Sequence, residues 1–390
     1  MATTRESHRL SVENVGPIKK ADVEFGDLTV LVGPQASGKS VFLQFLKLVV
    51  DPGHVLSELK KYGLDWNREV GSFLRIYFGE GMDAAWLAGK SQVFLNDHEV
   101  RIGGVVSRQR RDKKESLFFV PAQRVLALRD GWPRPFTDYR VGDPFVVREF
   151  SEKLRLLMEY EFGRQPVLFP QSKRLKHEFR TLLDKTIFRG FGLQVEKELQ
   201  KRLVLSGTGG ANLPFMVWSA GQREFVPLLL GLYWLLPPTK TPRRGQIEWV
   251  VIEEPEMGLH PRAISVLILL TFELLHRGYR VCLSTHSPQI VEGIWVLKLL
   301  SERQASPDAL LDVFQAPRTA PMRNLAASVL QKTARVFYFD PEKGTRDISS
   351  LDIDAEEAGE AGWGGLSEFS GRANRAVARA VANSERKLAS

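Results

Sequence analysis

The chain has 390 residues, of which 43% are hydrophobic and 26% charged, and its formal net charge is +8. This length gives room for two or three units that each bury a core, and the composition is that of a soluble globular protein whose positive charge permits contact with nucleic acid without requiring it. No stretch is long and apolar enough to span a bilayer and no apolar signal core is present, which predicts a cytoplasmic protein, and the single cysteine excludes an internal disulfide.

Three short strands are the first predicted elements, because runs of apolar or alternating residues are separated by turns that contain glycine. They cover residues 10–13, 21–25 and 28–32. The third strand runs directly into a glycine-containing loop. That loop opens a helix in which apolar residues recur at helical spacing from Phe42 to Val49. The sequence thus predicts a strand, a loop and a helix in immediate succession.

The loop fits the pattern G-x-x-x-x-G-K-[ST] at every fixed position. Its residues are Gly33, Pro34, Gln35, Ala36, Ser37, Gly38, Lys39 and Ser40. The two glycines let the backbone curl, so that successive N–H groups and the positive end of the helix attract a phosphate. We expect Lys39 to reach the β- and γ-phosphates of a nucleotide and Ser40 to place its hydroxyl on Mg²⁺. A glycine turn before an ordinary core helix is the alternative, and the flanking elements argue against it.

Beyond this helix the chain is expected to form a second helix and three more strands. The helix covers residues 55–62, and the strands cover 72–78, 91–96 and 117–120. A basic run, on an apparent hairpin, precedes the last strand. Its positive residues are Arg108, Arg110, Arg111, Lys113 and Lys114. Both a solvated hairpin tip and a contact for DNA or a partner protein fit this run.

The pattern divides the remaining chain into three parts. A mainly helical insertion is predicted at 131–214, because helical stretches at 145–161 and 175–188 are separated by breaks with glycine and proline. Strands and helices alternate again afterwards, and the tail ends in a predicted amphipathic helix. The predicted domains are therefore lobe I at 1–130, the insertion at 131–214, lobe II at 215–350 and the tail at 351–390.

Acidic and polar residues follow the strands of lobe II. Glu253 and Glu254 end one apolar strand, where one carboxylate would lie near Mg²⁺ and the next would polarise an attacking water. His286 follows the next strand, where an imidazole could hydrogen-bond the γ-phosphate, although a lone histidine there is more often structural. Ser219 and Gly221 precede an apolar helix and expose a helix N-terminus that suits an anion.

In order and character these stretches resemble the ATPases of the ABC superfamily, and within it the soluble branch of RecF, SMC and OLD-type proteins. The matching positions are Lys39 and Ser40 for Walker A, Gln123 for the Q-loop, Ser219, Gly221 and Gln222 for the signature, Glu253 and Glu254 for Walker B, and His286 for the switch histidine. The resemblance implies an α/β fold of the ABC type, with a mixed central sheet, an antiparallel β-subdomain and a mainly helical insertion. Glu253 departs from the usual Asp, and Gln35 from the usual Asn.

The resemblance also implies the ligands and the chemistry. ATP would bind to the loop at 33–40 and, across a pair of chains, to the signature residues Ser219, Gly221 and Gln222. Mg²⁺ would be held by Ser40, Gln123 and Glu253. Catalysis would rest on Glu254, His286 and Lys39. Binding of ATP would join two heads and hydrolysis would release them, so a homo-oligomer of at least two chains is expected.

Three biological roles remain open at this point. The phrase Ile-Glu-Glu-Pro-Glu, followed by Leu-His-Pro, resembles OLD-like and phage-defence ATPases. We therefore favour the ATPase component of an anti-phage system of PARIS or related type, with a separately encoded effector such as a nuclease or toxin. A RecF- or SMC-like ATPase of DNA repair or chromosome maintenance is the alternative, and it would use the basic run to bind DNA. The size of the insertion argues against a transporter subunit.

Overall fold

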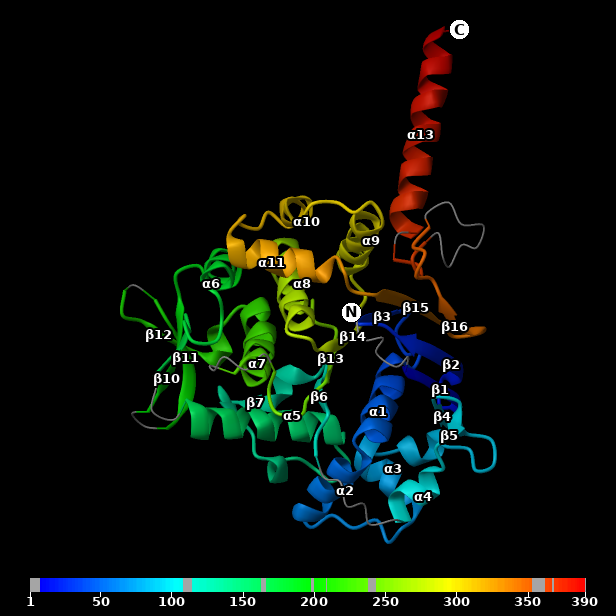
Figure 1. Ribbon diagram of the computed structural model, residues 1–390, viewed down its shortest axis with the longest axis vertical. Coiled ribbons are helices and arrows are strands. Elements are labelled where there is room, and N and C mark those ends of the chain that lie inside the picture. The colour runs from blue at the N-terminus through cyan, green and yellow to red at the C-terminus, as the bar shows by residue number, and fades with distance from the viewer. Residues whose placement is uncertain are drawn as a thin grey trace.

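A mixed six-stranded sheet forms the centre of the computed structural model (Figure 1). The structure describes residues 8–107, 114–162, 166–197, 200–207, 209–237, 243–352, 362–366 and 368–389. In spatial order the strands are β16 (Gly344–Asp347), β15 (Ala334–Asp340), β3 (Leu28–Val32), β14 (Arg280–Ser284), β13 (Trp249–Glu253) and β6 (Leu117–Val120). The strands from β15 to β6 run parallel, and β16 pairs antiparallel with β15. The carboxyl ends of five neighbouring strands therefore lie at one edge.

Both faces of this sheet are buried, which explains why its strands are apolar throughout. On one face, Leu28, Val30 and Val32 of β3 pack against three helices. These helices are α7 (Ala220–Leu235), α8 (Pro261–His276) and α9 (Pro288–Glu302). Leu31, one position out of phase, belongs to the core on the other face together with Phe42 of α1 (Lys39–Val50). The two-residue period of the strand thus divides the interior into two cores.

A four-stranded antiparallel sheet covers the core that contains α1. Its order is β2 (Ile18–Phe25), β1 (His8–Val15), β4 (Gln92–Leu95) and β5 (His98–Glu99). Further helices close this core, namely α2 (Pro52–Lys61), α3 (Val70–Phe78), η1 (Met82–Ala85) and α4 (Ile102–Ser107). This sheet is the predicted antiparallel β-subdomain of the N-terminal lobe.

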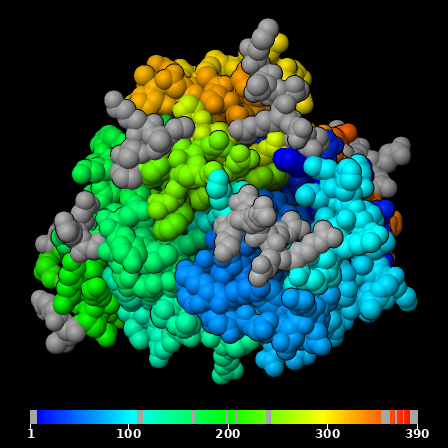
Figure 2. Space-filling view, turned by 60° about the horizontal axis from the view of Figure 1, so that its bottom comes forward, coloured from blue at the N-terminus to red at the C-terminus, as the bar shows by residue number. Residues whose placement is uncertain are grey.

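The insertion contains helices and a second antiparallel sheet. Its helical elements are η3 (Phe136–Asp138), α5 (Phe145–Leu156), η4 (Leu157–Glu161), α6 (His177–Leu183) and η5 (Asp184–Phe188). Its sheet has the order β12 (Asn212–Pro214), β11 (Arg202–Ser206), β10 (Gly192–Glu196) and β9 (Val167–Phe169). Helix α5 joins the two cores, because Phe145 belongs to one and Phe150 to the other. In Figure 2 the green surface of the insertion borders the blue and cyan surface of the N-terminal elements.

Short elements connect the lobes, and a helix ends the described chain. The connections are η2 (Arg124–Ala127), β7 (Leu128–Arg129), β8 (Trp132–Pro133) and η6 (Phe215–Val217), and α10 (Pro307–Val313) and α11 (Ala320–Val329) follow α9. Helix α13 (Glu368–Ala389) projects away from the body in Figure 1. Among the described helices, none combines the length and the apolar character that a membrane span requires.

The predicted fold class is confirmed, and one predicted strand is wrong. The segment 72–78 forms part of helix α3, because its buried residues Phe73, Leu74, Tyr77 and Phe78 recur at helical rather than alternating spacing. The sheet β9–β12 was not predicted, since its strands have only three to five residues each. The N-terminal strands, the loop-bearing helix and the α/β alternation of the C-terminal lobe follow the sequence.

Candidate functional site

The predicted motifs meet at the edge of the central sheet where its parallel strands end. The glycine-containing loop follows β3, His286 follows the neighbouring β14, Glu253 ends the next strand β13, and Gln123 follows β6 beyond it. Residues that are more than two hundred positions apart in the chain are thereby brought to one place. Ligands of open α/β sheets bind at such an edge.

Both glycines of the loop lie where a side chain could not fit. Gly33 has φ +145°, and a Cβ on it would come within 2.7 Å of the Phe339 carbonyl oxygen. Gly38 has φ +93°, and a Cβ there would come within 2.4 Å of a carbon of Ile18. The loop is thus wedged between β15 and the turn that joins β1 to β2, and it delivers the chain directly into α1.

Lys39 is buried and folded back over the loop. Its Nζ donates to the carbonyl oxygens of Gly33 at 2.8 Å and Pro34 at 2.9 Å, and to Ser37 Oγ at 3.4 Å. Burial lowers the pKa of Lys39, although Glu254 and Glu253 act in the opposite direction. Because an ammonium group has three donors, an entering phosphate oxygen would replace the longest of these contacts, the one to Ser37.

Glu253 is arranged to accept a cation. Its side chain is 2% exposed, Oε2 accepts a hydrogen bond from the Ala122 N–H at 3.2 Å, and the Ser40 hydroxyl also interacts with the carboxylate. Oε1 is buried without a hydrogen-bond partner. Burial raises the pKa of Glu253. A hydroxyl and an unsatisfied carboxylate oxygen side by side are the hard oxygen ligands that Mg²⁺ prefers, so these residues fit the ion that the motif implies.

Glu254 lies beside His286, the predicted switch histidine. Its Oε1 is 3.3 Å from His286 Nε2, and its backbone N–H donates to the Ser284 carbonyl at 3.0 Å. Burial, together with the nearby Glu256 carboxylate, raises the pKa of Glu254 to about 8. Burial and the charge of Lys39 lower the pKa of His286. A carboxyl group with this pKa is largely protonated near neutral pH, so it can act as a base only once its pKa is lowered, and a neutral imidazole can orient a water beside it.

Glu256 was not predicted as a site residue, although the motif Glu-Glu-Pro-Glu contains it. Its Oε1 accepts hydrogen bonds from the Thr285 hydroxyl at 2.7 Å and from the His286 N–H at 2.8 Å. The Glu256 carboxylate thereby ties the end of β13 to the end of β14 and fixes the backbone of the histidine. The available sequence signal was that Glu256 is the third acid within four residues. Its role could be inferred only once β13 and β14 were known to be neighbouring strands.

The signature residues begin helix α7. The Ser219 Oγ accepts from the Gln222 N–H at 3.3 Å, and the Ser219 N–H donates to Gln222 Oε1 at 3.1 Å, which completes a capping box. Gln222 Nε2 also donates to the Ile187 carbonyl at 3.3 Å, in the insertion. Gly221 packs against the Gly258 carbonyl, which a Cβ would approach to 2.9 Å. Within the described chain, no hydrogen bond or ion pair joins the signature residues to the loop at 33–40.

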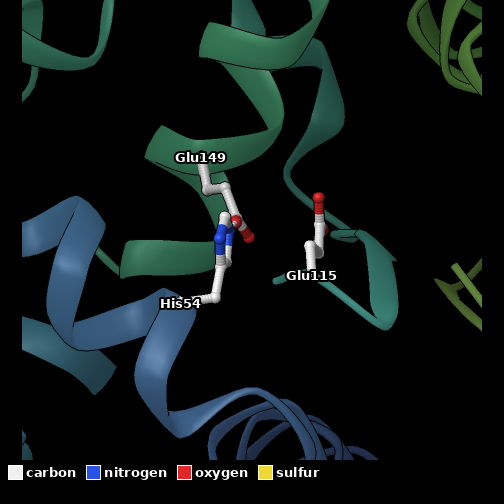
Figure 3. Close-up of side chains that lie close together, drawn as sticks. All are labelled: His54, Glu115 and Glu149. Atoms are coloured by element: carbon white, nitrogen blue, oxygen red, sulfur yellow. Dashed lines mark hydrogen bonds and ion pairs between the residues drawn. The ribbon is translucent and has the colours of Figure 1, made fainter. Parts of the chain in front are cut away.

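A second group of charged side chains is buried behind α1, and we call it the buried charge cluster. It consists of Lys47, Asp51, His54, Glu115, Glu149 and Lys153. In Figure 3, His54 on α2 and Glu149 on α5 point toward each other, with Glu115 beside them. One ligand atom from each of these three lies within 4.8 Å of the others, as a metal site would need. Lys47 and Lys153 already donate to the two carboxylates, so the cluster is a network of ion pairs.

The predicted basic run lies almost wholly outside the described residues. Arg108, Arg110, Arg111 and Lys113 are not described, and Lys114 precedes β6. The last described element before the run is α4. The use of these residues stays a prediction.

One protein family matches part of the chain. The family is described as "AAA domain, putative AbiEii toxin, Type IV TA system", and its profile matches residues 148–292. The match covers less than half of the chain and includes the signature, both strand-end glutamates and the switch histidine. A search of curated proteins gave no match.

Similar solved structures include SMC head domains and an ABC transporter cassette. The SMC head domain from Thermotoga maritima is 14% identical with a TM-score of 0.32, and the similarity covers 74% of this chain and 92% of that one. An SMC head bound to the C-winged helix domain of ScpA is 12% identical with a TM-score of 0.41, covering 74% and 91%. A dimeric bacterial ABC transporter cassette is 12% identical with a TM-score of 0.33, covering 73% and 90%. Similarity at this level does not inform the function of this chain.

Proposed function

We propose that this chain binds ATP with Mg²⁺ and hydrolyses it. The observation that carries the proposal is the juxtaposition of Lys39, Glu253 and Glu254 at one sheet edge, where the buried acids carry raised pKa values. Burial raises these pKa values, and a divalent cation would supply positive charge that stabilises the two carboxylates. The backbone N–H groups of residues 33–40 and the start of α1 would hold the β- and γ-phosphates.

The remaining site residues divide the chemistry among them. Ser40, Glu253 and the nearby Gln123 would hold Mg²⁺, which neutralises charge on the phosphates when bound. Glu254 would accept the proton of the attacking water, and the arrival of a cation would lower the pKa of this carboxylate and free it for that task. His286, 3.3 Å from Glu254, would orient the same water. Lys39 would carry the charge that develops on the γ-phosphate.

Two chains are proposed to share each site. Ser219 caps a helix whose N-terminus can receive a phosphate, yet it makes no contact with the loop of its own chain among the described residues. Apolar side chains surround it, with Met216 71% exposed, Val217 62% exposed, and Met257 38% exposed on the segment that meets Gly221. Exposed apolar groups beside an anion-binding helix end suit an interface that forms when a second chain presents its nucleotide.

Complementation between two inactive variants tests the shared site. Lys39→Ala removes the phosphate contact and Ser219→Arg fills the signature, so neither variant should hydrolyse ATP alone. Mixed, they form heterodimers that retain one site with a wild-type loop and a wild-type signature, and steady-state phosphate release should return. An inactive mixture in which heterodimers are demonstrated by co-purification of two differently tagged chains would contradict pairing across the signature.

For the biological role we propose prokaryotic anti-phage defence with a separately encoded effector. The description of the matching family, which names a putative AbiEii toxin, supports a role of this kind, as does the resemblance to OLD-like and PARIS ATPases. Plaque counts on bacteria that carry the gene with its neighbours should fall, and Glu254→Gln should restore them. Equal plaque counts for the two forms would argue against an ATP-driven defence role.

The DNA-repair alternative makes a separate prediction about the basic run. Replacing Arg108, Arg110, Arg111, Lys113 and Lys114 with Ser would weaken DNA binding for every sequence and flatten its salt dependence by up to roughly 0.9 per lost phosphate contact. ATP hydrolysis without DNA would persist, since no residue of the run belongs to a nucleotide motif. Wild-type protein without salt-sensitive DNA affinity would rule out this alternative and favour a docking surface for the effector.

A further inference from the structure

A buried arginine lies directly beneath the two glutamates of the site. Arg124 is fully buried at the start of η2, one position after Gln123. Its Nη1 donates to the Glu253 carbonyl oxygen and its Nη2 to the Glu254 carbonyl oxygen, both at 3.0 Å. The guanidinium group thus fixes the backbone of both residues through their carbonyl groups. The Glu253 side chain remains available to a metal ion and the Glu254 side chain to a water.

The backbone at Glu254 explains why two successive carbonyls can meet one guanidinium. Successive carbonyl groups of a strand point in opposite directions, and β13 ends at Glu253. Glu254 has φ +42°, a left-handed conformation that costs a residue other than glycine roughly 1–2 kcal/mol. This turn brings the two carbonyl oxygens to the same side. Arg124 therefore stabilises the conformation that aims the Glu254 side chain.

The same guanidinium contacts the helix that carries the signature. Its Nε donates to the Glu224 carbonyl oxygen at 3.1 Å, and its Nη2 is 3.5 Å from Glu224 Oε2. Glu224 lies in the second turn of α7, five positions after Ser219. Pro227 has no N–H group, so the carbonyl of Arg223, next to that of Glu224, lacks its helical donor and the ladder is interrupted in this turn.

We propose that Arg124 is a positioning residue that sets the orientation of Glu254 and couples it to the signature helix α7. The proposal rests on the proposed ATPase function and deepens it. When Ser219 closes on the nucleotide of a second chain, any shift of α7 passes through the Glu224 carbonyl to the Arg124 guanidinium and from there to the Glu254 carbonyl. Hydrolysis would then be favoured only in the paired state, because Glu254 would be aligned from the signature helix of its own chain.

Only arginine has the geometry for this role. The three contacts to carbonyls use Nε, Nη1 and Nη2 in one plane, and a lysine offers a single nitrogen on a flexible stem. Burial lowers the pKa of Arg124, and four glutamates act against this effect, namely Glu224, Glu256, Glu254 and Glu253. A lysine at this position keeps the positive charge beside these acids but cannot make the three planar contacts of the guanidinium group. Arg124→Lys therefore separates positioning from charge balance.

The test compares Arg124→Lys with a matched buried arginine. Arg148 is 2% exposed, donates to the Ile76 carbonyl at 2.6 Å, and has no contact with the site among the described residues, so Arg148→Lys reports the general cost of such a replacement. Steady-state kinetics should show kcat reduced about 10- to 100-fold in Arg124→Lys, with the KM for ATP changed less than about threefold. Arg148→Lys should lower the melting temperature and leave kcat unchanged.

Hydrogen exchange gives a second readout that does not need catalysis. In Arg124→Lys, amides of residues 219–226 and of residues 253–257 should both exchange faster than in wild type, whereas in Arg148→Lys they should not. A folded Arg124→Lys chain with wild-type kcat overturns the proposal, and so does unchanged exchange in either segment. If the wild-type chain neither binds nor hydrolyses ATP, the proposed function fails, and the exchange comparison still decides whether Arg124 links the two segments.

Discussion

Helix α1 carries two buried lysines, one at its first residue and one in its last turn, and their pKa values shift in opposite directions. Lys39 faces Glu253, Glu254 and Glu256, and burial lowers its pKa despite these acids. Lys47, two turns further on, is buried still more completely, yet Glu115, Glu149 and Asp51 outweigh burial and raise its pKa well above the usual value. The difference is direct contact, because all the acids near Lys47 lie within 3.4 Å of its Nζ, whereas Lys39 donates to backbone carbonyls.

The carboxylates of the two regions repeat this contrast. Burial alone would raise the pKa of Glu149 and of Glu115, but Lys153 and Lys47 outweigh it and hold both pKa values below the usual range. At the site no ion pair joins a lysine to Glu253 or Glu254 in the part of the chain that the structure describes, and both pKa values are raised. In the buried charge cluster every carboxylate contacts a lysine, and these ion pairs stabilise the packing of α1, α2 and α5. In the site the carboxylates of Glu253 and Glu254 have no such contact among the described residues, which leaves them able to meet a cation.

The largest effect is expected from removing Lys47, one of the two lysines of the buried charge cluster. Lys47→Met leaves Asp51, Glu115 and Glu149 without their shared cation and should lower the free energy of unfolding by about 3–5 kcal/mol. Urea denaturation measures this change. Lys61→Met is the matched control, because Lys61 pairs with Glu58 at the surface and its loss should cost less than about 1 kcal/mol. Equal costs for both variants would show that the buried charge cluster contributes no more than a surface pair.

The next effect comes from replacing the carboxyl group of Glu254, whose pKa is raised to about 8. Glu254→Gln should keep ATP binding and reduce turnover by about 10²-fold or more, and ATP-joined dimers should accumulate in size-exclusion chromatography. Its stability should equal or exceed that of wild type, since an amide removes a carboxylate with an unfavourable environment. Glu115→Gln should leave turnover unchanged and lower the free energy of unfolding, because it removes ion pairs with Lys47 and Lys153. Wild-type turnover in Glu254→Gln would refute its role as the base.

The site was largely predictable where its chemistry lies in contiguous residues. The loop from Gly33 to Ser40 contains its own turn, cation and hydroxyl, so one stretch of sequence specifies it. Glu253 and Glu254 could be found because an apolar strand that ends in acids is unusual. The structure adds that these segments meet, which follows from the parallel order of β3, β14, β13 and β6.

The residues that sequence reasoning missed act through contacts distant in the chain. Arg124 reaches carbonyls about a hundred residues away, and a backbone acceptor leaves no trace in the sequence. Lys47 lies on the apolar face of α1, where the sequence alone suggests a lysine whose head group reaches the surface. The structure shows instead that it is paired with Glu115 and Glu149. Pairing of this kind depends on tertiary register, and no local pattern encodes it.

A smaller effect should appear in the pH dependence of stability. Between its ordinary pKa of 4.5 and its raised value of about 8, Glu254 binds a proton in the folded state and not in the unfolded state. Its contribution to stability is therefore present at low pH and is lost as pH rises through about 8. The lowered pKa values of Glu115 and Glu149 act oppositely and lose stability below pH 4.5. Measured by urea denaturation from pH 5 to 9, the free energy of unfolding should fall less steeply with pH for Glu254→Gln than for wild type. Parallel curves would contradict the raised pKa of Glu254.

The smallest effect separates the two clusters by their response to Mg²⁺. With a non-hydrolysable ATP analogue present, added Mg²⁺ should raise the melting temperature of the wild-type chain, because Glu253 Oε1 and the Ser40 hydroxyl accept the ion. At a tenfold excess over the dissociation constant the stabilisation is about 1.4 kcal/mol. Glu253→Gln should abolish this increment. Glu115→Gln should keep it, although that variant begins from lower stability, since Lys47 and Lys153 already occupy the carboxylates near His54. An increment that persists in Glu253→Gln and disappears in Glu115→Gln would move the metal to the buried charge cluster and reverse the comparison.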